Sequence, residues 1–261
     1  MKDVVEALTH GELTVLGRLA GSSNATLLSV VKDHDGHEMK CVYKPVAGER
    51  PLWDFPDGTL AEREVAAYEL SQFLQWNVIP ATVWREEGPY GEGSLQLWVD
   101  AVDEMSLVDL IDANLAHDGW LHVLTGENES GQEVRMIHRD REDLAKIALL
   151  DVLMNNADRK AGHILVDESD QLWGIDHGLT FHEEPKLRTV LWGWAGARIP
   201  KQLKNDVESV RGRWVELESV LEQYLAGFEV RAVAERLDEV LESSAFPAPP
   251  DHWPAVPWPL F

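Results

Sequence analysis

The stretch NNADRKAGH, at residues 155–163, follows an apolar run and determines how the rest of the chain is interpreted. Asp158 in this stretch offers a carboxylate that can accept or orient the proton of a hydroxyl group. Asp176 follows 13 residues after His163, in the sequence Asp-His-Gly, and carboxylates of this kind hold divalent cations. The two motifs therefore predict a site that binds a metal ion and positions a hydroxyl group.

The composition of the chain limits which partners it can have. Its 261 residues are enough for one large domain or for two lobes that share a core. It carries 46 acidic and 23 basic residues, which gives a formal net charge of −23. Such a surface repels phosphate backbones and the anionic leaflet of a membrane. We therefore expect no nucleic-acid binding and no stable membrane association.

Cysteine content and hydropathy indicate a cytoplasmic protein. Cys41 is the only cysteine, so no internal disulfide can form, which fits a reducing compartment. Residues 1–6 lack the long apolar core of a signal peptide. No run of about 18 apolar residues, the length that spans a bilayer, occurs in the sequence.

Residues 1–100 show the pattern of strands with one helix. Apolar runs bounded by turns predict the strands, and an apolar stripe predicts a helix at residues 60–75. The expected strands span residues 13–19, 25–31, 39–44, 82–85 and 94–100. This part of the chain therefore predicts a β-rich N-lobe.

Residues 101–261 indicate a second, mostly helical lobe. Segment 142–155 is apolar on nearly all sides, which predicts a buried helix. The other expected features are a polar linker and insertion at 101–139 with a hairpin tip at 126–131, short strands at 164–166 and 172–175, helices within 201–243, and an extended Pro- and Trp-rich segment at 246–261.

A turn between the first two strands is the first candidate for binding a nucleotide. Gly21 allows the backbone to bend tightly there. Hydrogen bonds to phosphate oxygens could come from backbone N–H groups. The side chains placed to add to them are Ser22, Ser23 and Asn24. Taken alone, the same pattern also fits an ordinary hairpin turn.

Lys44 and Glu64 form the second candidate. Lys44 ends the third expected strand, where its ammonium could point at the α- and β-phosphates of a nucleotide. Glu64 follows 20 residues later on the expected helix and could hold Lys44 in place. Glu62 and Glu69 are alternatives on other faces of this helix. Each residue alone could also be an ordinary surface charge.

The residues around Asp158 could serve phosphate chemistry as well. Arg159 and Lys160 could offset phosphate charge. Asp151 lies within the apolar helix, where an isolated charge would be costly, so we expect it to hydrogen-bond the backbone of the following loop. It could instead face solvent near the end of the helix.

The order of these features predicts a bilobal α+β fold of the protein-kinase kind, with a β-rich N-lobe at 1–100 and a helical C-lobe at 101–261. Phosphoryl transfer needs positioning and charge neutralisation more than covalent chemistry, and ATP with Mg²⁺ or Mn²⁺ would be the cofactors. Backbone groups at Trp98 and Val99, where the lobes join, could bind adenine. Asp176 would hold the metal between the β- and γ-phosphates.

His163 departs from the protein-kinase pattern. In protein kinases an Asn stands five residues after the catalytic Asp and binds a second metal ion, whereas His163 occupies that place here. Imidazole suits Mn²⁺ better than Mg²⁺. We expect better activity with Mn²⁺ and a loss of activity as His163 protonates within about pH 5.5–8. Alternatively, His163 packs against the loop and water takes the metal position.

The chain resembles an uncharacterised bacterial family that is similar to phosphatidylinositol 3- and 4-kinases. The blocks that carry the resemblance lie at residues 22–26, 43–45, 49–56, 58–61, 63–68, 155–160, 174–178 and 187–194. The resemblance implies a kinase-like fold and ATP-dependent phosphotransfer to a hydroxyl group of a small molecule or a protein. The sequence lacks the basic segments expected of a lipid-docking enzyme, so the class of acceptor stays open.

Two other functions and two segments remain open. The chain could be a pseudokinase that binds nucleotide in a regulatory role, or it could transfer AMP. Residues 188–194, with one Arg and two Trp, could contact an acceptor or plug the helical lobe. Residues 49–56 could form a lid near the nucleotide or a packed loop.

Overall fold

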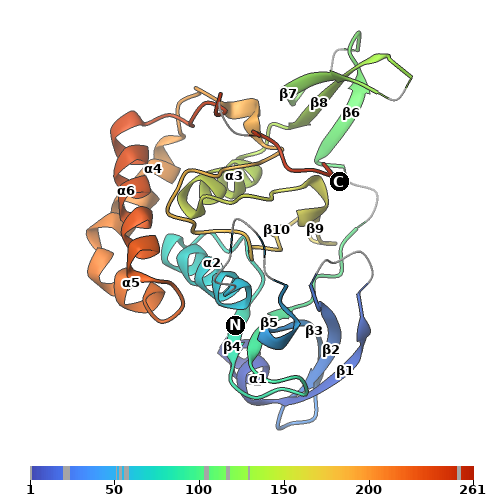
Figure 1. Cartoon of the computed structure of the whole chain (residues 1–261), viewed down its shortest axis with the longest axis vertical. Coiled ribbons are helices and arrows are strands. Elements are labelled where there is room, and N and C mark those ends of the chain that lie inside the picture. Colours follow the sequence, from blue (N-terminus) through green and yellow to red (C-terminus); the bar gives the residue numbers. More distant parts are fainter. Residues whose placement is uncertain are drawn as a thin grey trace.

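The computed structural model describes residues 2–19, 24–50, 52, 55, 59–102, 106–115, 118–128, 130–251 and 254–261. The chain has a sheet-rich N-terminal region and a helical C-terminal region, which lie in the lower and upper parts of Figure 1. This arrangement confirms the predicted bilobal α+β fold.

The N-terminal region is built on one antiparallel sheet of five strands in the order β1-β2-β3-β5-β4. The strands are β1 Glu12–Arg18, β2 Leu27–Lys32, β3 Glu38–Pro45, β4 Thr82–Arg85 and β5 Gly93–Leu97. Buried and partly exposed residues alternate along β2 and β3, as period-two patterning requires. The buried side chains of these strands, including Val31, Cys41 and Tyr43, form a core with Leu8 and Leu95.

Two helices accompany this sheet, where the sequence predicted only one. Helix α2 spans Leu60–Leu74 and agrees with the expected helix. Helix α1 spans Lys2–His10 and was not predicted. It buries Ala7 and Leu8, and Val4 and Val5 pack against the same core, so apolar residues at helical spacing were the available signal.

Helices dominate the C-terminal region. Its helices are α3 Glu142–Met154, α4 Lys201–Gly212, α5 Trp214–Leu221 and α6 Gly227–Ser243, with short 3-10 turns at Ala161–His163 and Trp192–Trp194. Nine residues of α3 are buried, which explains why its sequence is apolar on nearly all sides. The short strands β9 Ile164–Val166 and β10 Leu172–Gly174 pair as an antiparallel hairpin beside α3.

The segment expected as a linker and insertion forms a separate antiparallel sheet, and the hairpin tip predicted at 126–131 coincides with the turn between two of its strands. The sheet consists of β6 Val108–Asp112, β7 Trp120–Glu127 and β8 Glu133–Arg139 in the order β6-β8-β7. The sheet extends away from the helices at the top of Figure 1. His138 fastens it to the C-terminal region, because Nε2 of this buried ring accepts a hydrogen bond from the N–H of Gly193 at 3.0 Å.

Helix α2 is tied to the helices of the C-terminal region. Arg63 forms a buried ion pair with Glu229 of α6, with 2.6 Å between Nη2 and Oε1. Farther along, the backbone carbonyl of Phe73 accepts a hydrogen bond from Arg213 at 3.0 Å. The end of α2 that carries Glu64 is therefore held against the second region as well as against the sheet.

The Pro- and Trp-rich segment carries neither helix nor strand in its described part, residues 246–251 and 254–261. The carbonyl of Ala255 accepts hydrogen bonds from the backbone of Thr189 and the indole of Trp192. The carbonyl of Leu260 accepts one from Ala161 at 2.9 Å. The segment thus lies along the stretch that contains Asp158. No helix within the described ranges has the length and apolar character needed to cross a bilayer.

Candidate active site

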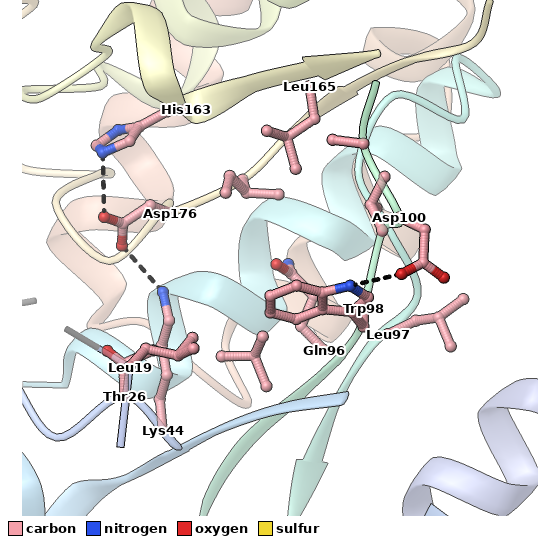
Figure 2. A pocket seen from close by; sticks show the side chains of 14 residues that line it. Leu19, Thr26, Lys44, Gln96, Leu97, Trp98, Asp100, His163, Leu165 and Asp176 are labelled. Carbon is pink, nitrogen blue, oxygen red and sulfur yellow. Dashed lines mark hydrogen bonds and ion pairs between the residues drawn. The ribbon is translucent and has the colours of Figure 1, made fainter. Parts of the chain in front are cut away.

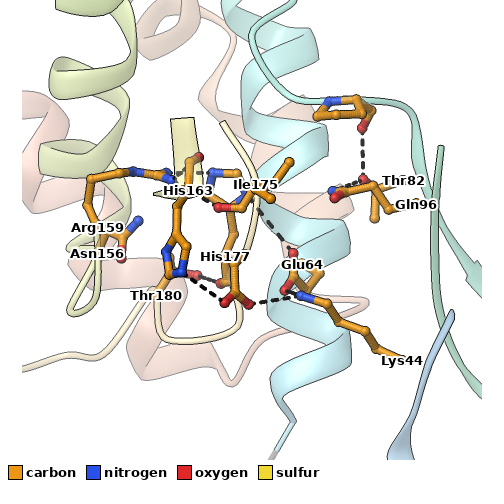
Figure 3. Close-up of polar contacts among 12 residues, drawn as sticks. Lys44, Glu64, Thr82, Gln96, Asn156, Arg159, His163, Ile175, His177 and Thr180 are labelled. Atoms are coloured by element: carbon orange, nitrogen blue, oxygen red, sulfur yellow. Dashed lines mark hydrogen bonds and ion pairs between the residues drawn. The ribbon is translucent and has the colours of Figure 1, made fainter. Parts of the chain in front are cut away.

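Lys44, Glu64 and Asp176 meet between the two regions (Figure 2, Figure 3). Lys44, near the end of β3, donates hydrogen bonds to Glu64 Oε1 and to Asp176 Oδ1, the latter at 2.9 Å. Only 2% of the Glu64 side chain is exposed, against 51% of the Asp176 side chain. Glu64 is therefore an internal anchor for Lys44, whereas Asp176 faces the space that a ligand can enter.

Lys44 and Asp176 stabilise each other's charge, whereas burial and the charge of Asp176 raise the pKa of Glu64 against the opposing effect of Lys44. Burial works against the charge of Lys44, but Asp176 and Glu64 outweigh it and hold the pKa of Lys44 above its ordinary value. The ammonium of Lys44, opposed by burial, holds the pKa of Asp176 well below its usual range. Asp176 is therefore an ionised carboxylate at neutral pH, as a metal ligand must be. Its φ of 59° lies in the left-handed region, a strained conformation of the kind found at functional sites.

His163 lies beside Asp176, at the end of a 3-10 turn. Its Nε2 is 3.4 Å from Asp176 Oδ2, and its Nδ1 is buried without a hydrogen-bond partner among the described residues. Burial lowers the pKa of His163 to about 4, although Asp176 opposes this shift. The ring therefore stays neutral between about pH 5.5 and 8, and the expected loss of activity in that window is not supported.

Asp158 is presented by the loop that follows α3. Asn155 ends this helix in the left-handed conformation, which Asn tolerates, and its side chain donates to the backbone of His182 at 2.9 Å. Asn156 then accepts a hydrogen bond from the backbone of Asp158 at 2.9 Å. Burial raises the pKa of Asp158, partly offset by Lys160, whose Nζ lies 2.9 Å from Oδ2. This loop therefore holds a carboxylate of increased basicity.

Arg159 does not face the site, so the prediction that it offsets phosphate charge is wrong. Its side chain is fully buried and donates to both carboxylate oxygens of Asp151. It also donates to the backbone carbonyls of His163 and Ile175 at 3.1 and 2.9 Å. All these contacts point into the protein, so Arg159 brings no charge to the cavity that Asp158 lines. Arg159 therefore supports the loop from inside.

Asp151 takes the role expected of it only in part. It does approach the loop, but its carboxylate accepts hydrogen bonds from the side chains of Asn156, at 2.9 Å, and Arg159 instead of from the loop backbone. This pairing explains why a carboxylate can lie fully buried within an apolar helix.

A cavity of about 580 Å³ opens between the regions above Lys44 (Figure 2). Its lining includes the apolar side chains Leu19, Val42, Leu165 and Ile175, the strand end Gln96–Ala101, and Lys44, His163 and Asp176 at one end. Trp98 lines this space, and its indole donates to Asp100 at 3.0 Å. The N–H of Val99 has no hydrogen-bond partner in the described part of the chain. An apolar slot that ends in charged groups is suited to a nucleotide.

A smaller cavity of about 170 Å³ adjoins the first. Asp158, Lys160 and Leu179 line it, and Lys44, His163 and Asp176 contribute to both spaces. A group bound in the large cavity would therefore meet Asp158 across the charged cluster.

The predicted phosphate-binding turn is only partly visible. Gly21, Ser22 and Ser23 lie outside the described residues. Asn24 lines the smaller cavity, and its Oδ1 accepts a hydrogen bond from the backbone of Arg50 at 3.0 Å.

Segment 188–194 contributes little to the site through its tryptophans. Trp192 is buried, and Trp194 packs against His138, with ring centroids 4.3 Å apart. Arg188, by contrast, acts on Asp158, because its positive charge partly opposes the rise that burial causes in the pKa of that carboxyl. In segment 49–56, Glu49 accepts a hydrogen bond from the backbone of Ala61 at the start of α2, and most other residues lie outside the described ranges.

Asp176 and His163 are the residues that fit a divalent metal. The 3.4 Å between Asp176 Oδ2 and His163 Nε2 is close to the separation of about 3.0 Å between neighbouring ligands of an octahedral cation. Among the described residues no group of three His, Cys, Asp or Glu side chains could hold a metal by itself. The two groups thus suit a cation that takes its other ligands from phosphates and water.

His177 is a residue of the site that the sequence reasoning passed over. Its ring is buried behind Asp176, between Arg159 and Glu64. The only available signal was its position between Asp176 and Gly178 in the Asp-His-Gly motif.

Residues 62–212 match the family model described as phosphatidylinositol 3- and 4-kinase. The chain belongs to this family. It is 48% identical over 267 residues to Protein Rv2133c of Mycobacterium tuberculosis (strain ATCC 25618 / H37Rv), which covers 97% of this chain and 94% of that protein. These similarities agree with the family resemblance inferred from the sequence.

Two solved structures are similar to this chain in fold. The structure of hydra Fam20 with sugar matches with a TM-score of 0.58 at 15% identity, over 92% of this chain and 87% of that one. The Helicobacter pylori proinflammatory kinase CtkA has a TM-score of 0.48 at 12% identity, over 92% and 94% of the two chains. With the family match, the first of these supports a kinase-like fold.

Proposed function

We propose that this chain is an ATP-dependent phosphotransferase that moves the γ-phosphate of ATP to a hydroxyl group of a small molecule or a protein. The observation that supports this most is the arrangement around Lys44. Its ammonium, anchored by Glu64, lies at the charged end of a nucleotide-sized cavity, and Asp158 lines the adjoining space. Lys44 would contact the phosphates, with Glu64 as its anchor.

The apolar part of the large cavity would hold the adenine ring. Val42 of β3 and Leu19 after β1 belong to the sheet, and Leu165 of β9 and Ile175 after β10 belong to the C-terminal region, so a planar base would fit between them. Backbone groups at Trp98 and Val99 would provide hydrogen bonds. The turn that contains Gly21, Ser22, Ser23 and Asn24 would cover the phosphates.

Asp176 and His163 would hold the metal ion, Mg²⁺ or Mn²⁺. When bound, this ion neutralises the charge that develops on the phosphates. Its ligands would be Asp176 Oδ2 and the neighbouring His163 Nε2, because Lys44 already contacts the other oxygen of Asp176, Oδ1.

Asp158 would orient the acceptor and take the proton of its hydroxyl group. Burial raises the pKa of this carboxyl, which makes it a better proton acceptor than an exposed carboxylate. Lys160 would then offset negative charge next to it.

The rest of the proposal concerns organisation and partners. Residues 1–100 would form the N-lobe and residues 101–261 the C-lobe. The partners would be ATP and the acceptor, without nucleic acid and without stable membrane association, because the net charge of −23 repels anionic surfaces. Because Cys41 is the only cysteine and fits a reducing compartment, the protein would be cytoplasmic.

The proposal is tested by nucleotide binding and turnover together. Thermal unfolding is measured with ATP and with Mg²⁺ or Mn²⁺, since a ligand of the native state raises stability. Mass analysis of the products then separates phosphate transfer from AMP transfer, because an AMP adduct is the heavier one. Binding without turnover would indicate a pseudokinase instead, and no shift with any nucleotide–metal pair would contradict the proposal.

A further inference from the structure

His177 lies between two ion pairs that come from different parts of the chain (Figure 3). On one side, its Nε2 is 2.8 Å from Nη2 of Arg159, which pairs with Asp151 of α3. On the other side, its Nδ1 is 4.0 Å from Oε2 of Glu64, which pairs with Lys44 of β3. The ring therefore stands between the loop that carries Asp158 and the anchor of Lys44.

The contact with Arg159 determines where the ring of His177 carries its proton. A guanidinium only donates hydrogen bonds, so Nε2 must accept with its lone pair. A nitrogen that accepts in this way holds no proton, so the contact at 2.8 Å is made by a neutral ring. A neutral ring with an accepting Nε2 carries its hydrogen on Nδ1.

The proton on Nδ1 faces Glu64. Nδ1 is buried and has no hydrogen-bond partner among the described residues, and a buried donor left in this state costs about 1–3 kcal/mol. The two oxygens of Glu64 differ in their contacts, because Oε1 accepts from Lys44 whereas Oε2 is turned toward His177. Closure by about 1 Å would bring Nδ1 and Oε2 within hydrogen-bond distance.

We propose that His177 is a positioning residue that couples Glu64, and through it Lys44, to Arg159 and the catalytic loop. The inference rests on the function proposed above. Binding of nucleotide phosphates to Lys44 draws Glu64 and His177 together, and the Nδ1–H···Oε2 hydrogen bond forms. The anchor of the phosphate-binding Lys and the loop that holds Asp158 then move as one unit, and His177 itself contacts neither ATP nor acceptor.

Two substitutions separate the contact of His177 with Arg159 from its contact with Glu64. His177→Asn can keep an N–H donor near the position of Nδ1 but loses the acceptor for Arg159. His177→Gln can keep an acceptor near the position of Nε2 but loses the donor toward Glu64. His177→Phe keeps the ring and loses both polar contacts. His138→Gln serves as a control. His138 is buried like His177, but both of its ring nitrogens have hydrogen-bond partners, and it lines neither of the two cavities.

The first measurement needs no activity. Nitrogen NMR of the ¹⁵N-labelled protein reports the tautomer of each ring, and the signals of His177 are those missing in His177→Phe. We expect the Nδ1–H tautomer without nucleotide, and a change in the Nδ1 signal on addition of ATP with Mg²⁺ or Mn²⁺. A proton on Nε2, or an Nδ1 signal that nucleotide binding leaves unchanged, would overturn the inference.

The second measurement separates kcat from KM for ATP turnover. We expect His177→Gln to lower kcat about tenfold or more with a KM for ATP within about threefold of wild type, because positioning acts in the transition state. The substitution Glu64→Gln should lower kcat by a smaller factor in the His177→Gln background than in the wild type. Equal losses in both backgrounds, or losses no greater than those of His138→Gln, would contradict a coupling role.

Failure of the proposed function gives a different pattern from failure of this inference. If wild-type protein neither binds nor turns over ATP, the proposed function fails. The tautomer of His177 without nucleotide then decides the part of the inference that needs no ligand. A proton on Nδ1 supports acceptance of the Arg159 hydrogen bond by Nε2, and a proton on Nε2 would overturn the inference.

Discussion

Arg159 and Asp151 form a fully buried ion pair, in which Nε and Nη2 of the guanidinium each lie 2.9 Å from a carboxylate oxygen. The two residues join the loop that carries Asp158 to the buried helix α3. The conformation of the loop therefore depends on a contact that no substrate can reach.

Breaking this pair should destabilise the protein strongly. Asp151→Ala leaves the guanidinium of Arg159 buried without its counter-ion, and such a change costs about 3–5 kcal/mol in the free energy of unfolding. Urea unfolding of wild type and variant measures the difference. The control is Asp238→Ala, which breaks an ion pair with Arg211 whose side chains are 49% and 35% exposed. The control should cost less than about 1 kcal/mol, and equal losses would contradict the account.

Lys44 should be required for both nucleotide binding and turnover. Lys44→Met removes the ammonium that faces the phosphates and leaves Glu64 buried without its partner. We expect turnover to fall by about a hundredfold or more and the thermal shift with ATP to disappear. Lys32→Met, on the neighbouring strand β2 and exposed, should leave both unchanged. A Lys44→Met protein that keeps the thermal shift would remove Lys44 from the phosphate site.

His138 should make the fold sensitive to acid. Its Nδ1 faces the carbonyl of Arg139 at 2.9 Å, and its Nε2 accepts a hydrogen bond from the N–H of Gly193. Protonation of Nε2 would therefore place one N–H group directly opposite another. Burial lowers its pKa to about 4, whereas an unfolded His titrates near about 6.5. Between these values the unfolded chain binds more protons, so stability falls as pH falls, by at most about 3 kcal/mol from this residue.

The contribution of His138 can be isolated by difference, because His163 and His177 also have lowered pKa values. Unfolding free energies of wild type and His138→Gln are measured at intervals between about pH 7 and 4.5. The variant should lose less stability over this range than the wild type. Parallel curves would show that His138 is not the residue responsible.

His163 should influence which metal supports activity. Imidazole is a more natural ligand for Mn²⁺ than for Mg²⁺, and an amide oxygen favours Mg²⁺. We therefore expect wild-type turnover to be higher with Mn²⁺, and His163→Asn to shift the ratio of the two rates toward Mg²⁺. Initial rates with each metal at equal concentration measure this. A ratio that the substitution leaves unchanged would indicate that His163 does not contact the metal.

The sequence predicted the fold and much of the cluster at the site because order along the chain carries that information. Lys44 at a strand end, Glu64 on the next helix and Asp176 after a hairpin meet in the structure at hydrogen-bond distance. Order does not reveal the direction of a side chain. Arg159 stands next to Asp158 in the sequence, yet it points into the protein toward Asp151.

Other features were missed for related reasons. The short helix α1 has its apolar residues next to a run of strands, and only packing against the sheet reveals it. The polar segment before α3 forms the sheet β6–β8, which His138 and Trp194 attach to the C-terminal region. The pKa of His163 depends on burial, which its neighbours in the sequence do not indicate.

The most direct test of the central claim is ATP turnover by wild type and by Asp158→Asn, with product masses recorded. The account predicts that wild type releases ADP and transfers a phosphate to water or an acceptor. Asp158→Asn should lose turnover by about a hundredfold or more while it keeps the thermal shift with ATP and metal. Equal turnover by the two proteins, or transfer of AMP in place of phosphate, would contradict the account.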